Sequence, residues 1–156
     1  MTPQNSSVTV RPAQARDVDF ICQSNLAMAA ETEDLALDGA LLKSGIEYLF
    51  NHPAEGRYFV AERDGIPAGT LMVTYEWSDW RAGRFWWIQS VYVLAEHRRH
   101  GVYRAMHNVV YDHARRDPQA CGVRLYVEQN NDRAMQTYSS LGMAETHYRL
   151  FEELIR

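Results

Sequence analysis

Residues 91–107 read VYVLAEHRRHGVYRAMH, and this stretch decides which fold the sequence predicts. Its β-branched and aromatic start predicts a strand ending near Leu94, and apolar residues at helical spacing predict a helix over 102–116. The first turn of a helix leaves backbone N–H groups unpaired, and these donors favour an anion such as pyrophosphate. Gly101 has no Cβ and would let such an anion approach the backbone. Taken alone, the stretch is more often an ordinary strand-to-helix turn with solvated arginines.

The rest of the chain predicts one mixed α/β (α+β) domain over residues 1–156. Strands are expected at 8–11, 68–77, 85–94, 123–127 and 143–152, and another runs from Arg57 into a hairpin turn at Asp64-Gly65. Helices are expected at 15–30, 41–50, 102–116 and 131–141, with the acidic stretch ETEDLALD as a loop or broken helix. The order β-α-α-β-β-β-α-β-α-β predicts helices packed around one sheet.

Composition excludes several classes of protein. The chain has 46% hydrophobic and 23% charged residues and a net charge of −4, which argues against disorder and against a general nucleic-acid binder. Its apolar runs are shorter than the roughly 20 residues that span a membrane, and MTPQNSSVTV lacks the features of a signal peptide.

The cysteines and histidines predict neither a disulfide framework nor a metal site. Cys22 and Cys121 have no pair spacing. His97 and His100 have no second pair of ligands and are expected on the surface. We therefore expect a cytoplasmic protein that uses no metal.

A second motif follows the first by about thirty residues. The segment YVEQNNDRAMQTYSSLGM, residues 126–143, places Asn131, Ala134, Tyr138 and Gly142 at the spacing N-x-x-A-x-x-x-Y-x-x-x-G. Together with R-x-x-G at Arg98 and Gly101, it resembles the GNAT superfamily of acyl-CoA N-acyltransferases, and the order of elements extends the resemblance over nearly the whole chain. The resemblance implies a GNAT-like fold, with a mixed, mostly antiparallel sheet flanked by helices.

The same resemblance implies an enzyme that transfers groups other than aminoacyl groups. It would move an acetyl or other acyl group from acetyl-CoA to a primary amine of a small molecule or peptide, by direct attack in a ternary complex. No cysteine lies in the matching motifs, which argues against a covalent acyl-enzyme. The alternative is a non-catalytic acyl-CoA sensor of the same fold.

The resemblance also assigns roles to residues. The main chain of Val91, Tyr92 and Val93 would bond the pantetheine arm, and Asn131 would also bond it. The pyrophosphate would lie on the loop formed by Arg98, Arg99, His100, Gly101, Val102, Tyr103 and Arg104. The family prefers Gly or Ala where this chain has Tyr103, so the cradle requires Tyr103 to lie inside the helix with its ring turned away.

Two proton-transfer roles remain. The resemblance would place Tyr138 beside the thioester sulfur, where its phenol can protonate the leaving thiolate; the alternative is a tyrosine that only packs. Glu76 is the candidate base because its neighbours Tyr75 and Trp77 suggest an apolar setting; the alternative is a solvated carboxylate. Asp79 and Glu31 are rival bases.

All four tryptophans lie in EWSDWRAGRFWW, at Trp77, Trp80, Trp86 and Trp87. They would wall an acceptor pocket, or form hairpin core and a protein contact that favours a homodimer. Strand alternation puts Trp86 and Trp87 on opposite faces, so they cannot both line one pocket. The acidic segment around Glu31 would suit an amine acceptor, or is simply a solvated loop.

Overall fold

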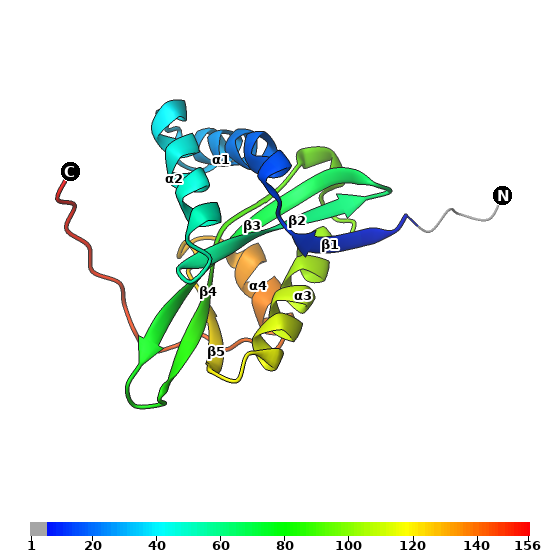
Figure 1. Ribbon diagram of the computed structural model, residues 1–156. Helices are drawn as coiled ribbons and strands as arrows, with labels where there is room; N and C mark the ends of the chain where they lie inside the picture. Colours follow the sequence, from blue (N-terminus) through cyan, green and yellow to red (C-terminus); the bar gives the residue numbers. More distant parts are fainter. Residues whose placement is uncertain (1–5) are drawn as a thin grey trace. The chain divides into compact units, whose positions relative to one another are not determined.

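The computed structural model describes residues 6–156 (Figure 1). The chain forms two compact units, Met1–Tyr126 and Val127–Arg156, and each is taken by itself below. No helix in the described range is both long and apolar enough to cross a membrane.

The first unit contains a five-stranded sheet with helices on both faces. Its elements are β1 (Val8–Pro12), η1 (Ala15–Asp17), α1 (Val18–Glu33), α2 (Gly39–Asn51), β2 (Gly56–Arg63), β3 (Ile66–Ser78), β4 (Gly83–Val93), η2 (Ala95–His97), α3 (Val102–Arg116) and β5 (Ala120–Leu125). The strands lie in sequence order, and all neighbours are antiparallel except β4 and β5, which are parallel. The predicted mixed, mostly antiparallel sheet is therefore confirmed.

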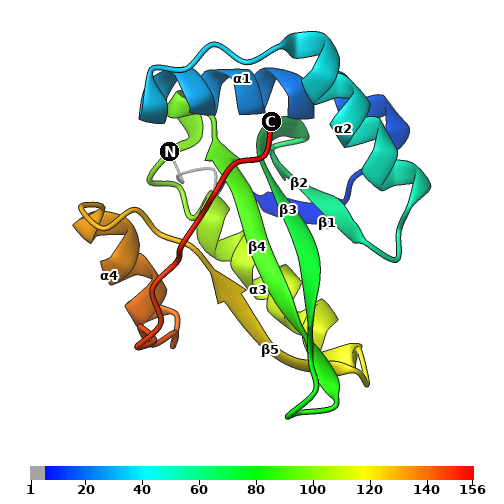
Figure 2. The same ribbon diagram turned by 90° about the vertical axis from the view of Figure 1, so that its left-hand side faces the viewer.

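Strand alternation divides the core into two layers. Phe59 on β2 joins Met106 and Val110 of α3 in one buried cluster. Its neighbour Tyr58 points to the opposite face and packs with Ile21 of α1 and Ile46 of α2. The two clusters hold α3 on one face and the α1–α2 pair on the other (Figures 1 and 2).

The hairpin turn between β2 and β3 is confirmed at Asp64-Gly65. Both residues have positive φ, 53° and 80°, as the tight two-residue turn of a right-twisted hairpin requires. The helix predicted over 102–116 is also confirmed. The acidic stretch ETEDLALD differs in part from the expected loop or broken helix. Helix α1 continues into it through Glu33 and ends at Asp34, which has a left-handed φ of 49°.

The second unit holds α4 (Asp132–Ser140), which ends before Gly142 with its φ of +91°. The strand predicted over 143–152 is wrong, since residues 143–156 form neither helix nor strand. Apolar residues favour a strand here, but a strand is stabilised only by a ladder with a neighbour and by a buried face. The sheet of five strands includes no residue of this segment.

Candidate active site

The end of β4 differs from a regular strand in two ways. Thr70 pairs with Tyr92 and Met72 with Gln89, so two residues of β4 oppose one residue of β3 in a β-bulge. Ser90, inside the bulge, has a φ of +49°. A non-glycine residue reaches this backbone region only where its surroundings hold it there.

The parallel pairing between β4 and β5 also ends early. Its last pair is Ile88 with Leu125, the last residue of β5, whereas β4 continues to Val93. Within the described residues, the stretch Val91–Val93 therefore pairs with β3 and with no strand on its other edge. An open strand edge accepts an extended ligand through main-chain hydrogen bonds, which is the role expected of Val91, Tyr92 and Val93.

The loop after β4 brings the start of α3 to the same end of the strand. Arg99 and Gly101 both have positive φ, 63° and 75°, and Gly101 is the N-cap of α3. A Cβ built on Gly101 meets no heavy atom within 4 Å, so the space in front of its backbone is open. The first N–H groups of α3 have no partner within the helix and can serve an anion there.

Tyr103 lies inside α3, as the cradle requires. Its ring is half-buried against the cluster around Met106, and its hydroxyl lies 3.4 Å from Nδ1 of His107, one turn further along the helix. The ring is thus in contact with the next turn of the helix. His107 itself is buried, and its pKa is lowered by burial and by the nearby charge of Arg104.

The Arg98 side chain links the loop to α1 and to the end of β4. Its Nη2 donates to Glu31 Oε2 at 2.8 Å, and its Nε donates to the Val93 carbonyl at 2.9 Å. Glu31 Oε1 also accepts from the hydroxyl of Tyr92 at 2.6 Å. One carboxylate at the end of α1 therefore holds both the end of β4 and the loop after it.

The electrostatics of this cluster follow from its hydrogen bonds. Bonds from Tyr92 and Arg98 lower the pKa of Glu31, and the bond to Glu31 raises the pKa of Tyr92. Arg98 was expected to attract phosphate, but its guanidinium is already paired with Glu31. By contrast, Arg99, His100 and Arg104 are exposed.

Glu76 does not lie beside Val91–Val93, the segment expected to bind the cofactor. It pairs in register with Phe85, which precedes Val91 by six residues, a separation of roughly 20 Å along a strand. Its side chain is 49% exposed and forms an ion pair with Arg124 at 2.8 Å. The expected apolar setting is therefore wrong. Its rival Asp79 lies in the hairpin turn and accepts from the N–H of Trp80.

In the second unit, Asn131 is the N-cap of α4. Its Oδ1 accepts from the Ala134 N–H at 3.1 Å, so the side chain can donate outward through its Nδ2 amide. Tyr138 lies on α4, and its carbonyl accepts from the N–H groups of Leu141 and Met143 at the helix end. Both predicted residues are placed here relative to α4 alone.

The tryptophans are separated by the sheet. Trp86 is buried in the core and donates to Asp117 at 3.0 Å, whereas Trp87 packs against Tyr126 at a tilt, with ring centroids 4.4 Å apart. Trp77 and Trp80 are exposed on the β3–β4 hairpin. The predicted opposite orientation of Trp86 and Trp87 is confirmed, and the four rings form no common wall.

Sequence reasoning missed two features near the loop. The bulge at Ser90 has no sequence signal, because serine is not a residue that marks positive φ. His97, expected on the surface, is half-buried, and its Nδ1 is buried with no hydrogen-bond partner among the described residues. The 3₁₀ turn Ala95–His97 folds it inward, and its N–H donates to the Leu94 carbonyl.

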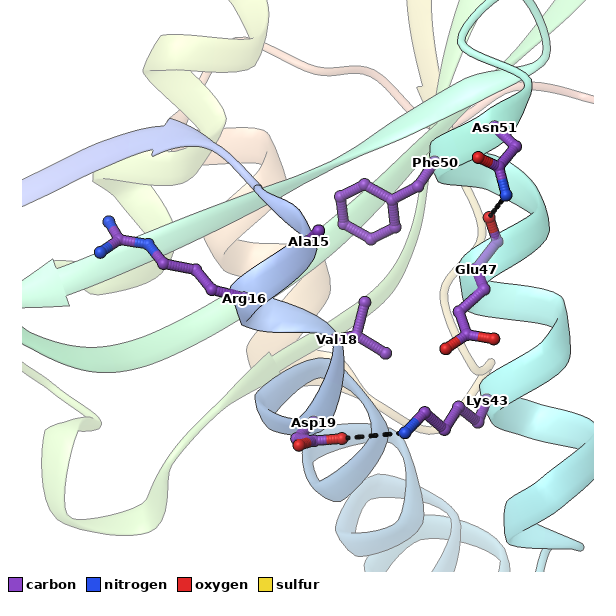
Figure 3. Close-up of a pocket in the computed structure, with 8 residues that line it drawn as sticks. All are labelled: Ala15, Arg16, Val18, Asp19, Lys43, Glu47, Phe50 and Asn51. Atoms are coloured by element: carbon purple, nitrogen blue, oxygen red, sulfur yellow. Dashed lines mark hydrogen bonds and ion pairs between the residues drawn. The ribbon is translucent and has the colours of Figure 1, made fainter.

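A pocket of about 390 Å³ lies elsewhere in the first unit, between the start of α1 and the last turns of α2 (Figure 3). Lys43 and Asp19 form an ion pair at 3.4 Å on its wall, and Phe50 closes its other end. None of the expected cofactor residues lines it, so the open edge of β4 remains the candidate site.

Comparison with known proteins points to one family. Residues 26–143 match the model of the acetyltransferase (GNAT) family. No curated protein is similar enough in sequence to count as a match. A solved structure described as a possible acetyltransferase from Clostridium difficile 630 is 39% identical, with 96% of this chain and 98% of that chain covered and a TM-score of 0.87.

Two more distant structures share the fold. A predicted acetyltransferase from Clostridium acetobutylicum, crystallised with acetyl-CoA, is 14% identical, with 96% and 97% of the two chains covered and a TM-score of 0.76. Glucosamine-6-phosphate N-acetyltransferase from Arabidopsis thaliana is 18% identical, with 94% and 98% covered and a TM-score of 0.71.

Proposed function

Because the chain belongs to the acetyltransferase (GNAT) family, we propose that it transfers an acetyl group from acetyl-CoA to a primary amine of a small molecule or peptide. The observation that carries the proposal is the open edge of β4 beside the Gly101 start of α3. The acetyl-CoA bound by the structural relative from Clostridium acetobutylicum supports the choice of donor. The family match crosses both units and supports treating residues 1–156 as one domain.

The residues present fit acetyl-CoA. The N–H and carbonyl of Val91 and the N–H of Val93 would bond the pantetheine arm. The Val93 carbonyl already accepts from Arg98, and Tyr92, in register with Thr70, turns its main-chain groups toward β3 as Leu94 does. The start of α3 would take the pyrophosphate through backbone N–H groups, with Arg99 and Arg104 adding charge. Asn131 would donate its Nδ2 amide to the pantetheine. The bound donor supplies an acetyl thioester that is reactive toward an amine.

The chain's own residues would handle the protons. Tyr138 would serve as the proton donor to the departing sulfur, because a phenol hydrogen-bonds readily to a thiolate. Glu76, Glu31 and Asp79 are the candidate bases for the amine proton, and Glu76 would need a water chain, given its distance along the sheet from Val91. No cysteine lies in the cofactor loop or on α4, which favours direct attack in a ternary complex.

Thiol release tests the proposal. Purified protein receives acetyl-CoA with panels of small amines, amino acids, polyamines and peptides, and free thiol is recorded over time. We expect turnover with one acceptor class, and Tyr138→Phe should lower kcat about 100-fold or more while leaving acetyl-CoA affinity unchanged. Tyr111→Phe is the matched control, because Tyr111 is an exposed tyrosine on α3. Comparing Glu76→Gln, Glu31→Gln and Asp79→Asn for a loss of kcat identifies the base.

The remaining outcomes discriminate the alternatives. Tight binding of acetyl-CoA with no thiol release on any acceptor would favour the acyl-CoA sensor. No binding of coenzyme A at all would refute both functions. A cytoplasmic location, and the absence of a metal or nucleic-acid partner, stay predictions.

A further inference from the structure

Glu31 occupies a position that its own helix does not favour. It lies in the last turn of α1, which carries no basic residue, and Glu33 adds a second carboxylate to the same turn. A negative charge near the C-terminal end of a helix opposes the helix dipole, so α1 gains no stability from Glu31. The contribution of this side chain therefore comes from what it contacts outside α1.

Both oxygens of this carboxylate accept hydrogen bonds from the end of β4 and the loop after it. The donors are the Tyr92 hydroxyl, 2.6 Å from Oε1, and Arg98 Nη2, 2.8 Å from Oε2. The Arg98 guanidinium also lies over the Tyr92 ring, 5.5 Å from its centroid. All three residues belong to the unit Met1–Tyr126, and we call them the Glu31 cluster.

The cluster holds a segment whose backbone is strained at both ends. Ser90 and Arg99 have φ values of 49° and 63°, and neither is glycine. Such residues keep this conformation only where neighbouring contacts hold it. The bonds from Tyr92 and Arg98 to Glu31 lie between the two strained residues, so the cluster fixes the path of the chain as it leaves β4.

The same segment joins the two places assigned to the acyl donor. The open edge at Val91 and Val93 is at one end of it, and the Gly101 start of α3 follows the other end. Arg98 also limits the open edge, because its Nε donates to the Val93 carbonyl at 2.9 Å. A ligand that uses both places binds most tightly when their spacing is fixed before it arrives.

We propose that Glu31 is a positioning residue for the acyl donor: it fixes the spacing between the strand edge that binds the pantetheine arm and the helix start that binds the pyrophosphate. This role rests on the proposed function and differs from that of a base. Both oxygens of Glu31 already accept hydrogen bonds, and the bonds from Tyr92 and Arg98 lower its pKa, which makes the carboxylate a poorer proton acceptor.

Two substitutions separate positioning from proton transfer. In Glu31→Gln the amide can still accept from Arg98 and donate to the Tyr92 hydroxyl oxygen, so both hydrogen bonds survive without the charge. Glu31→Ala removes both bonds. In calorimetric titration we expect the Kd for coenzyme A to rise roughly two- to fivefold in Glu31→Gln and roughly tenfold or more in Glu31→Ala.

Steady-state kinetics give a second measurement. A positioning role places the loss in the KM for acetyl-CoA rather than in kcat, because the acetyl thioester still lies on the edge at Val91. The pH profile of kcat should keep its acidic limb in both variants, since the group that takes the amine proton is unchanged.

A matched variant and a shorter ligand serve as controls. Glu33→Ala removes an exposed carboxylate from the same turn of α1 and should leave the Kd for coenzyme A unchanged. Pantetheine lacks the pyrophosphate and the nucleotide and would use the strand edge alone. Its affinity should therefore be the same for the wild-type chain and for Glu31→Ala.

Failure of this role and failure of the proposed function give different results. No binding of coenzyme A to the wild-type chain would refute the donor site itself. Wild-type binding with an unchanged Kd in Glu31→Ala would overturn the positioning role alone, as would an equal loss in Glu33→Ala or an equal loss for pantetheine. A collapse of kcat in Glu31→Gln at unchanged Kd would also overturn it, because Glu31 would then be the base.

Discussion

Replacing Gly101 by alanine separates a role in cofactor binding from a role in folding. With a φ of +75° at Gly101, an alanine there adopts the left-handed region, at a cost of about 1 kcal/mol. No steric term adds to this cost, because the new Cβ meets no heavy atom within 4 Å. For a chain of this size we expect a melting temperature lower by about 2–4 °C.

Gly65→Ala is a matched control in the β2–β3 turn. Its φ of +80° and its open surroundings are like those of Gly101, so the two variants should lose similar stability. Only at Gly101 would the new methyl group enter the space assigned to pyrophosphate. Losing one hydrogen bond to a charged group costs about 1.5–3 kcal/mol, or roughly a 10- to 100-fold weaker Kd for coenzyme A.

Calorimetric titration with coenzyme A and a thermal melt of each variant supply the measurements. Equal affinity in Gly101→Ala and Gly65→Ala would refute the cradle at the start of α3. An affinity that fell equally in both variants would point to a general loss of folded protein instead. Equal melting shifts with a Kd change confined to Gly101→Ala are the expected result.

Three further predictions concern side chains. Glu31→Gln removes the charge that holds Arg98, so titration should show coenzyme A binding weaker by roughly two- to fivefold, the range for one exposed ion pair, with an unchanged melting temperature. Asp17→Asn breaks the bidentate pair between Arg11 and the buried Asp17. It should lower the free energy of unfolding, measured in urea at pH 7, by about 2–3 kcal/mol. Hydrogen bonds from Arg11 lower the pKa of Asp17, so its contribution is present at neutral pH and is lost only as the pH falls below about 4; the Asn variant should lack this acid-dependent loss. Burial lowers the pKa of His107, so the unfolded chain binds the proton more tightly than the folded chain does. The urea midpoint of unfolding should therefore fall as the pH drops below about 6.5, and this fall should be smaller in His107→Gln.

The sequence by itself determined the helices and the tight turn. A helix repeats every 3.6 residues with bonds between near neighbours, so the apolar spacing from Val102 fixed α3 to the residue. Asp64-Gly65 needed only its own backbone preferences to make the turn. The candidate cofactor loop could be predicted in the same way, because Gly101 lies between the strand that ends near Leu94 and the helix that begins at Val102.

Tertiary structure decided everything that depends on register between distant strands. The bulge at Ser90 and the early end of the β4–β5 ladder arise from pairing across the sheet, and no local pattern encodes them. The same register placed Glu76 opposite Phe85, six residues before Val91 on β4, while the fold of α1 brought Glu31 to Arg98 across 67 positions of sequence. A strand likewise needs a partner that its own residues cannot supply, which is why the strand expected over 143–152 could not be decided from the sequence.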